Sequence, residues 1–332
     1  MSLATPHAVI VLATYQGAAW IGAQLQSLVE QTCPDWRLIA RDDGSTDGTA
    51  DVLAQFAQSD SRIEVVHDTL GRLGPVGNFA NLLNVARNTA ADYVLCADQD
   101  DVWRPDKLSR QLAAAQAALA EWGADVPLLV HSDLEVVDER LRMIQASLMA
   151  SSGLDPRPEC PLRALLPQNF VTGCALLANR ALLEIALPVP DQAALHDWWL
   201  ALCAAACGRI VYLPEPLVRY RQHPGNQVGA AGSATLLGRF LRQPRQRFAR
   251  HARNFRQGIA QARALQQRID ERSLVIPPRE RDLLASYASL FDPAIPRMQR
   301  WAGVRRLGIR PTGSLKNLAY YSQLWCQSSR GL

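Results

Sequence analysis

Short apolar runs alternate with amphipathic segments in the first part of this 332-residue chain, and this alternation restricts its fold more than any other feature. The runs are β-branched or aromatic, as buried strands are. Between them, apolar residues recur three and four positions apart, the spacing of a helix with one buried face. Strands and helices in alternation predict a Rossmann-like α/β domain with a mainly parallel central sheet flanked by helices, whose ligands bind beyond the carboxyl ends of the strands. The predicted strands are Ala8–Leu12, Trp36–Ala40, Ile63–His67 and Tyr93–Cys96.

The pattern continues less regularly in the next part of the chain. Leu128–Asp133 and Val171–Ala178 are predicted as strands, and Arg180–Ile185 as a short helix. Residues 146–167 are rich in Pro, Ser and Gly. We expect a mobile connection there, of the length that often forms a lid or a binding loop.

Charge is distributed unevenly along the chain. Residues 1–230 contain 16 basic and 26 acidic side chains, a net charge of −10, whereas residues 231–332 contain 19 basic and 5 acidic ones, a net charge of +14. After Gly232 a stripe of apolar residues is surrounded by arginines, which predicts a basic, mainly helical C-terminal appendage. Such an appendage either docks on the rest of the protein or meets an anionic membrane surface. It has no recognisable nucleic-acid-binding motif, so we expect no nucleic acid partner.

Composition places the protein in a reducing compartment. The seven cysteines form no CxxC pair, and most lie in apolar surroundings, which favours buried reduced thiols over a zinc site. The chain shows neither an apolar run of about 18 residues nor the basic start of a signal peptide. We therefore expect a cytoplasmic protein, with the membrane contact placing it peripherally at the inner face of the cytoplasmic membrane.

Three aspartates lie within four positions just after the strand at 93–96: Asp98, Asp100 and Asp101. Like charges so close together raise one another's pKa unless a cation neutralises them. Mg²⁺ and Mn²⁺ take carboxylate oxygens together with waters and substrate phosphates. The cluster therefore predicts a divalent metal site, and the competing interpretation is an Asp-rich turn with a helix cap.

Polar residues also follow the first two predicted strands. Asp43 can accept a hydrogen bond from a pyrimidine N–H, and the ring of Tyr15 can lie against the base. The glycine-rich stretch GRLGPVG has neither the GxGxxG spacing nor a P-loop lysine. These residues predict a mononucleotide site without a standard phosphate loop, and a solvated turn is the alternative for Asp43.

A second acidic site begins a later apolar helix, in the sequence HDWWLAL. Asp197 precedes Trp198 and Trp199, and apolar neighbours can raise a carboxyl pKa toward the range of a general base. Tryptophan faces also stack on sugar rings, so both indoles are candidates for binding a carbohydrate acceptor. The alternative is an acid that interacts with the helix dipole above a Trp-packed core.

Three motifs together, VIVLATYQGAAW, IARDDGSTDGT and DYVLCADQDDVWRPDKL, resemble the nucleotide-binding half of family 2 glycosyltransferases with a GT-A fold. The resemblance runs from about Val9 to Leu108 in unbroken order. It implies that four residues face the nucleoside and that Asp98-Gln99-Asp100 is the DxD motif, which holds a metal on the sugar-nucleotide diphosphate. The implied nucleoside residues are Ala13, Thr14, Tyr15 and Asp43.

The resemblance extends to later residues. It implies that Asp197 is the catalytic base, and HDWWLAL and LPEPLVRYRQHPGNQVG are similar to the rhamnosyltransferase-like branch. Several GT-A enzymes take a third metal ligand from a histidine at the place of His223, for which an exposed loop histidine is the alternative. Asp101 is then a helix cap or a support for the metal ligands, and Arg219 and Arg221 either meet phosphate oxygens or are solvated.

Together these features predict a GT-A catalytic domain over 1–232, divided into a donor half (1–108) and an acceptor half (109–232), followed by a helical appendage over 233–332. The expected activity is inverting, metal-dependent transfer of a sugar, rhamnose above others, from a dTDP- or UDP-linked donor to a glycan or lipid-linked acceptor. Two other classes stay open: a sugar-nucleotide nucleotidyltransferase, against which the lack of a basic loop near the N-terminus counts, and a non-catalytic sugar-nucleotide-binding protein.

Overall fold

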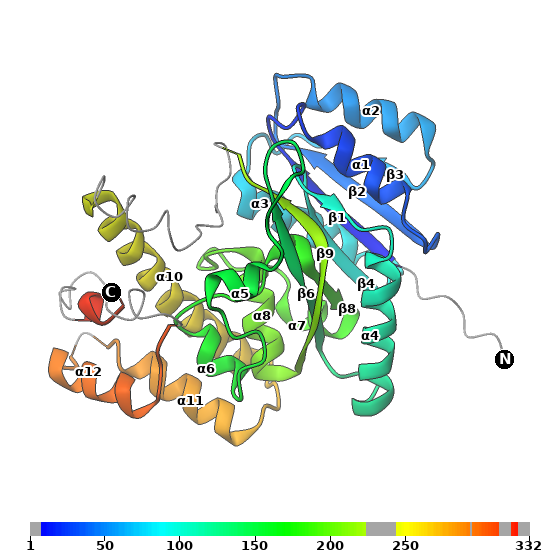
Figure 1. Ribbon diagram of the computed structural model, residues 1–332. Coiled ribbons are helices and arrows are strands. Elements are labelled where there is room, and N and C mark those ends of the chain that lie inside the picture. Colours follow the sequence, from blue (N-terminus) through cyan, green and yellow to red (C-terminus); the bar gives the residue numbers. More distant parts are fainter. Residues whose placement is uncertain (1–7, 224–243, 293, 312–319, 325–332) are drawn as a thin grey trace. The chain divides into compact units, whose positions relative to one another are not determined.

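The computed structural model describes residues 8–223, 244–292, 294–311 and 320–324 (Figure 1). By its internal contacts the chain divides into two compact units. Unit 1 comprises Met1–Leu148, Val171–Val189 and Arg209–Ala230; unit 2 comprises Met149–Phe170, Pro190–Gly208 and Ala231–Leu332. The domain boundary predicted between 232 and 233 stays a prediction. It was drawn from composition alone, and composition did not indicate that Met149–Phe170 and Pro190–Gly208 group with the C-terminal helices.

Unit 1 is built on one mixed sheet with the strand order β3-β2-β1-β4-β8-β6-β9-β5, and β7 pairs with β6. The first four strands along the chain pair in parallel, as predicted, and β6 and β9 are also parallel. Antiparallel pairs join β8 to both β4 and β6, and β5 to β9. The strands are β1 (Ala8–Thr14), β2 (Trp36–Asp42), β3 (Ile63–Val65), β4 (Tyr93–Asp98), β5 (Val102–Trp103), β6 (Leu128–Val137), β7 (Met143–Gln145), β8 (Leu176–Asn179) and β9 (Arg209–Arg221).

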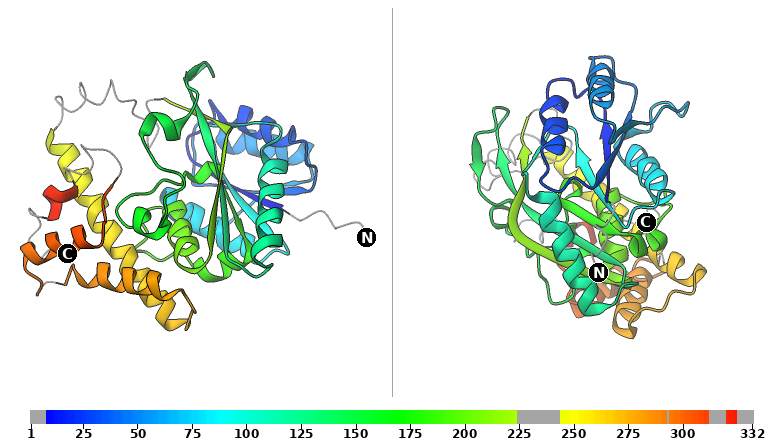
Figure 2. Two further views of the ribbon diagram at one scale, coloured as in Figure 1. Left: turned by 60° about the horizontal axis from the view of Figure 1, so that its bottom comes forward. Right: turned by 90° about the vertical axis from the view of Figure 1, so that its right-hand side faces the viewer.

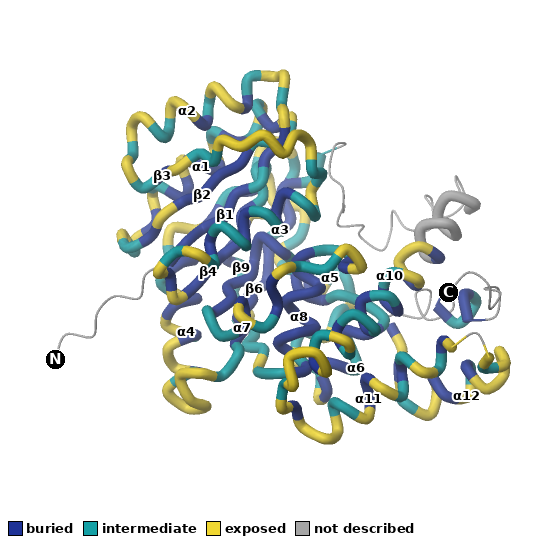
Figure 3. The backbone as a smooth tube through the Cα atoms, turned by 180° about the vertical axis from the view of Figure 1, so that it is seen from behind, coloured by how far each residue is buried: buried dark blue, intermediate teal, exposed yellow. Residues whose placement is uncertain are grey.

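Helices cover both faces of this sheet (Figure 2). Alternate residues of β1 point to opposite faces, so Ile10 and Leu12 join one core together with Leu25 of α1, Leu53 of α2 and Leu112 of α4. Strands β1, β4 and β6 are almost entirely buried, whereas the outer turns of α2 and α4 are exposed (Figure 3). The helices of unit 1 are α1 (Ile21–Val29), α2 (Thr49–Ser59), α3 (Gly74–Arg87), α4 (Lys107–Trp122) and α7 (Arg180–Ala186), with the 3₁₀ turn η1 (Gly173–Ala175).

Strand β9 was not predicted, because it contains Pro214 and Pro216 and proline interrupts the hydrogen-bonded ladder. The structure accommodates them by a register shift: Ser132 pairs with Leu213, and the next residue of β6 pairs with Pro216. Beyond this irregularity the two strands pair again. The shift thus lets one long strand reach Arg221 beside the acidic cluster.

Unit 2 is helical in the residues that the structure describes. In α10 (Pro244–Glu271) the predicted stripe is buried from Ala252 onward, and Phe255 packs edge to face on Phe291 and Tyr320. The part of the stripe before Ala252 lies outside the side chains that the structure describes. The segment 146–167, where a mobile connection was expected, contains α5 (Leu148–Ser152) and α6 (Pro161–Leu165), each too short to show helical periodicity. Its mobility stays a prediction. The other helices of unit 2 are α8 (His196–Cys207), α10 (Pro244–Glu271), α11 (Pro278–Ser289) and α12 (Arg297–Arg306).

Membrane-spanning helices are not found within the described residues, since none of their helices combines the length and the apolarity needed to cross a bilayer.

Candidate functional site

The end of β1 lies between two polar clusters of unit 1. In the parallel ladders, Ala13 pairs with Arg41 of β2 on one side and with Asp98 of β4 on the other. Because all three strands end at the same edge, the segments that follow them meet there. Sheet register therefore brings together the predicted nucleoside residues and the predicted metal residues.

Gln99 holds the loop after β1 by two hydrogen bonds. Its Oε1 accepts from the backbone N–H of Tyr15 at 2.8 Å, and its Nε2 donates to the carbonyl of the same residue at 2.9 Å. Thr14 is buried, and its hydroxyl donates to Asp42 at 2.9 Å. The side chain of Gln99 thus links the DxD segment to the backbone of Tyr15.

Asp43 is 2% exposed and pairs with Arg41, whose Nη1 donates to Oδ1 at 2.8 Å. The backbone N–H groups of Leu73 and Gly74 donate to its two oxygens, each at 2.7 Å. The alternative of a solvated turn acid is therefore wrong. A carboxylate has about four acceptor positions, so Asp43 can still accept from a nucleobase.

The ring of Tyr15 has a cation on one face. The guanidinium of Arg72 lies 4.0 Å from the ring centroid, within cation–π range. Arg72 belongs to the glycine-rich stretch between β3 and α3, where Gly71 and Gly74 adopt positive φ angles of 68° and 71°. This stretch consequently contacts the same ring that was predicted to lie against the base.

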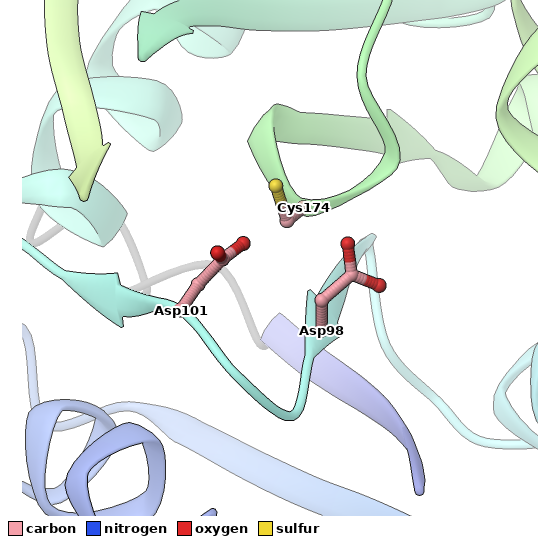
Figure 4. A group of neighbouring side chains, drawn as sticks. All are labelled: Asp98, Asp101 and Cys174. Carbon is pink, nitrogen blue, oxygen red and sulfur yellow. The ribbon is translucent and has the colours of Figure 1, made fainter. Parts of the chain in front are cut away.

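Asp98, Asp101 and Cys174 form a compact group beyond the end of β4 (Figure 4). Their potential ligand atoms all lie within 4.8 Å of one another. Cys174 comes from η1, just before β8, so the sheet brings it to the two carboxylates. Burial raises the pKa of the Cys174 thiol well above its usual value, and the two aspartates raise it further. The thiol therefore stays protonated at neutral pH.

Asp101 is wholly buried, and its Oδ1 accepts from the backbone N–H of Arg221 at 3.0 Å. The helix-cap interpretation is wrong, because this donor belongs to β9 and the next helix begins only at Lys107. Burial raises the pKa of Asp101 well above its usual value, and Asp100 and Asp98 add to the shift. A cation in the cluster would offset both effects.

Asp100 and His223, which are 123 positions apart in the chain, are brought together in unit 1. Nε2 of His223 lies 2.8 Å from Oδ2 of Asp100. The imidazole stacks on the indole of Trp20 with centroids 5.3 Å apart and an interplanar angle of 26°. Arg221 lies 4.7 Å from the same indole, and its Nε donates to the carbonyl of Asp100 at 2.7 Å. The alternative of an exposed loop histidine is wrong, since the side chain of His223 is only 12% exposed.

These residues fit a hard divalent cation. Asp98 and Asp100 are half-buried carboxylates at the strand end, and His223 supplies a nitrogen beside one of them. Hard cations prefer oxygen ligands to sulfur. The most compact set of potential ligands is Asp98, Asp101 and Cys174, and the neighbouring pair Asp100 and His223 could supply two further ligand atoms.

A buried lysine adds positive charge behind this cluster. Lys107 is 0% exposed, and its ammonium lies 3.5 Å from the ring centroid of Trp103 and 2.7 Å from Oε1 of Gln111. Burial lowers the pKa of Lys107 to about 7, although Cys174, Cys96 and Asp101 act in the opposite direction.

Asp197 belongs to unit 2, in the first turn of α8. It is 7% exposed, and its Oδ1 accepts from the backbone N–H of Trp198 at 2.5 Å and from Nδ2 of Asn169 at 3.2 Å. Burial lowers the pKa of the adjacent His196 to about 3, so this imidazole is neutral at physiological pH.

The two tryptophans after Asp197 are enclosed within unit 2. Trp198 is 6% exposed and donates from Nε1 to the carbonyl of Leu165 at 2.8 Å; Trp199 is 0% exposed, with the guanidinium of Arg268 lying 5.4 Å from its ring. Sugar stacking needs an accessible ring face. This packing does not support the predicted acceptor contact and favours the alternative of a Trp-packed helix start.

Sequence reasoning did not single out Trp20, Arg41 or Cys174. Only Arg41 could have been identified from the sequence, because a basic residue directly before Asp42 and Asp43 is a candidate ion-pair partner for these acids. Trp20 reaches the site through the loop after β1, where it stacks on His223. Cys174 reaches it because β8 pairs with β4. The local sequence around these two residues indicates neither contact.

Part of this chain is similar in sequence to a known protein family and to known proteins. Residues 9–122 match the model of glycosyl transferase family 2. The dTDP-rhamnosyl transferase RfbG of Shigella flexneri is 27% identical over 66% of this chain and 74% of its own length. A putative teichuronic acid biosynthesis glycosyltransferase of Bacillus subtilis, TuaG, is 37% identical over 32% of this chain and 41% of its own.

A solved structure shows the same fold. The mannosyltransferase PcManGT of Pyrobaculum calidifontis, in complex with GDP-Man and Mn²⁺, superposes on 97% of this chain and 76% of its own with a TM-score of 0.50 at 19% identity. Over residues 9–122 the chain belongs to glycosyl transferase family 2, and with its GT-A fold it is a nucleotide-sugar glycosyltransferase.

Proposed function

We propose that this protein is an inverting, metal-dependent transferase that moves rhamnose from a dTDP- or UDP-linked donor to a hydroxyl group of a cell-surface glycan or a lipid-linked acceptor. The similarity to RfbG of Shigella flexneri supports the sugar, and that to TuaG supports a role in envelope polysaccharide assembly. Mn²⁺ in the complex of PcManGT supports the metal.

The observation that carries this proposal is the contact between Asp100 and His223 at the end of β4. These two residues, 123 positions apart, approach to 2.8 Å, and Asp100 directly follows Gln99, which holds the backbone of Tyr15. A diphosphate carries charge that needs a cation at this sheet edge. The predicted ligands therefore adjoin the predicted nucleoside contacts within unit 1.

Each residue of the donor end has a distinct task. Asp43, held by Arg41, accepts from the base, while Thr14 and Tyr15 lie against the nucleoside. Asp98, Asp100 and His223 hold the cation, which when bound stabilises charge on the departing diphosphate. Gln99 keeps the loop of Tyr15 in register with these ligands, so that nucleoside and diphosphate are positioned together.

Asp197 is the proposed general base. Its Oδ1 is oriented by Asn169 and by the N–H of Trp198. In the proposed single displacement it removes the proton from the acceptor hydroxyl, whose oxygen attacks the anomeric carbon as the bond to the diphosphate breaks. One displacement inverts the anomeric configuration.

A panel of nucleotide sugars tests the donor. We expect dTDP-rhamnose with Mn²⁺ to raise the thermal unfolding midpoint, because a ligand that binds the folded state stabilises it, and GDP-mannose to raise it less. Removal of Mn²⁺ with a chelator should abolish most of the shift. If no nucleotide sugar stabilises the protein with Mn²⁺ present, the proposed function fails.

A further inference from the structure

Helix α12 presents one face to unit 2 and the opposite face to solvent (Figure 3). Three buried residues, Arg300, Gly303 and Val304, recur at helical spacing and define the inner face. Gly303 lies so close to Leu290 that a Cβ atom there would clash with its side chain, and Nη2 of Arg300 donates to the carbonyl of Asp292 at 3.1 Å. The orientation of α12 within unit 2 is therefore fixed.

The outer face combines cations with large apolar side chains. It comprises Met298, Trp301 and Arg305 at spacings of three and four, flanked by Arg297 and Arg306. Met298 is 60% exposed, and the guanidinium of Arg305 lies 4.7 Å from the ring centroid of Trp301. We call these five residues the α12 outer face.

The C-terminal sequence that contains α12 is basic. The sequence contains no Asp or Glu from position 293 to the last residue, 332, whereas it contains seven Lys and Arg residues there. The adjoining acid, Asp292, accepts the backbone N–H of Ala294 at 2.8 Å. The face therefore presents positive charge together with exposed apolar surface.

This combination fits one kind of partner. Arginines are attracted to the negative surface potential of anionic bilayers, tryptophan prefers the boundary between headgroups and acyl chains, and an exposed methionine can enter that boundary. The apolar stripe of α10 cannot fulfil this role, because Phe255 and Ile259 are buried within unit 2. A membrane contact made by the described C-terminal residues would therefore use a surface other than this stripe.

We propose that the α12 outer face docks on an anionic lipid bilayer. The proposal goes beyond sugar transfer and rests on the packing and charge of α12, although a lipid-linked acceptor would give the contact a purpose. Each arginine near such a surface strengthens binding about fivefold. Three arginines with a tryptophan and a methionine are enough for reversible attachment, and no part of the bilayer is spanned.

Co-sedimentation of the full chain with vesicles tests the proposal. We expect binding to phosphatidylcholine vesicles that contain phosphatidylglycerol, and little binding to phosphatidylcholine alone. The variant R297E/R305E/R306E should bind at least about 100-fold more weakly, since three charges are reversed. W301S/M298S should also bind more weakly, and should do so at high salt as well, because its loss is not electrostatic.

A matched control separates position from net charge. The variant R37E/R140E/R279E makes the same charge change at three other exposed arginines, and it should bind vesicles within about twofold to fivefold of the wild type. Equal loss in both triple variants would overturn the proposal, as would equal binding of the wild type to neutral and anionic vesicles. Tighter binding to duplex RNA than to vesicles, lost in the α12 variant, would also overturn it in favour of a nucleic acid surface.

The same samples distinguish this proposal from the proposed function. Thermal stabilisation by the donor with Mn²⁺ should be unchanged in the α12 variants, which also shows that they fold. Lost donor stabilisation with intact vesicle binding counts against the function alone, and the reverse result counts against the α12 outer face alone.

Discussion

The acidic end of β4 and the acidic start of α8 both hold a half-buried or buried carboxylate, but by different means. Asp100 is positioned by His223 and Arg221, which lie more than 120 positions away in the sequence. Asp197 is positioned by the N–H of its own neighbour and by Asn169, 28 positions away. The donor end therefore depends on sheet pairing, whereas the proposed base depends on a helix start and one amide.

The largest effect should separate chemistry from donor binding. Asp197→Asn keeps the shape of the side chain and removes the proton acceptor, so transfer should fall by about 10³-fold. Donor affinity measured by calorimetry should stay unchanged. Wild-type turnover in this variant would exclude Asp197 as the base, and lost donor affinity would show that the two ends are not separable in this way.

The complementary variant acts on the donor end. Asp100→Asn removes a charged oxygen ligand, so donor affinity in the presence of Mn²⁺ should fall by about 100-fold, while the weaker affinity without metal is unchanged. Calorimetry with and without Mn²⁺ measures both. Asp106→Asn, an exposed acid six positions later that pairs with Arg104, is the matched control and should behave as the wild type.

The free energy of unfolding should depend on pH through Lys107, a buried lysine of the donor end that has no counterpart at the start of α8. Its pKa is lowered to about 7 in the folded protein, below the unfolded value, so between these values the unfolded chain binds more protons and stability rises with pH. We expect a gain of up to about 2 kcal/mol between roughly pH 7.5 and 9, absent in Lys107→Met. Denaturant unfolding at both pH values measures it; equal pH dependence in the two proteins would mean that Lys107 is not the titrating group.

A smaller effect is expected at Trp20, which contacts His223 only through its ring. Trp20→Ala should weaken Mn²⁺ binding by about tenfold, because the imidazole loses its stacking partner, and Trp20→Phe should restore most of it. Quenching of protein fluorescence by Mn²⁺ gives the affinity. Identical losses in the two variants would show that the indole supports the loop and does not position the imidazole.

Much of the donor half was predictable because its strands are local, continuous apolar runs. β1, β2 and β4 begin at the predicted residues, and the acids at their ends share one sheet edge as expected. The prediction that Asp101 caps a helix failed because its partner is the backbone of Arg221, and no local pattern connects residues in β9 with the end of β4.

The remaining features depend on contacts that sequence periodicity does not encode. β5 has two residues and is a strand only through its pairing with β9. Cys174 reaches Asp98 because β8 runs antiparallel to β4. Trp199 is enclosed by residues that come much later in the chain, such as Arg268 of α10. The local sequence HDWWLAL was therefore equally compatible with a sugar contact and with a buried indole.

Gly17 has a consequence for how this loop can change in evolution. A Cβ atom there would clash with the amide of Gln99, the group that holds Tyr15. Gly17→Ala should therefore harm donor binding in the wild type and be nearly harmless once Gln99 is replaced by serine. Positions 17 and 99 are thus coupled: either substitution alone loosens the loop of Tyr15, and the loss of donor affinity in the double variant should be smaller than the sum of the two single losses.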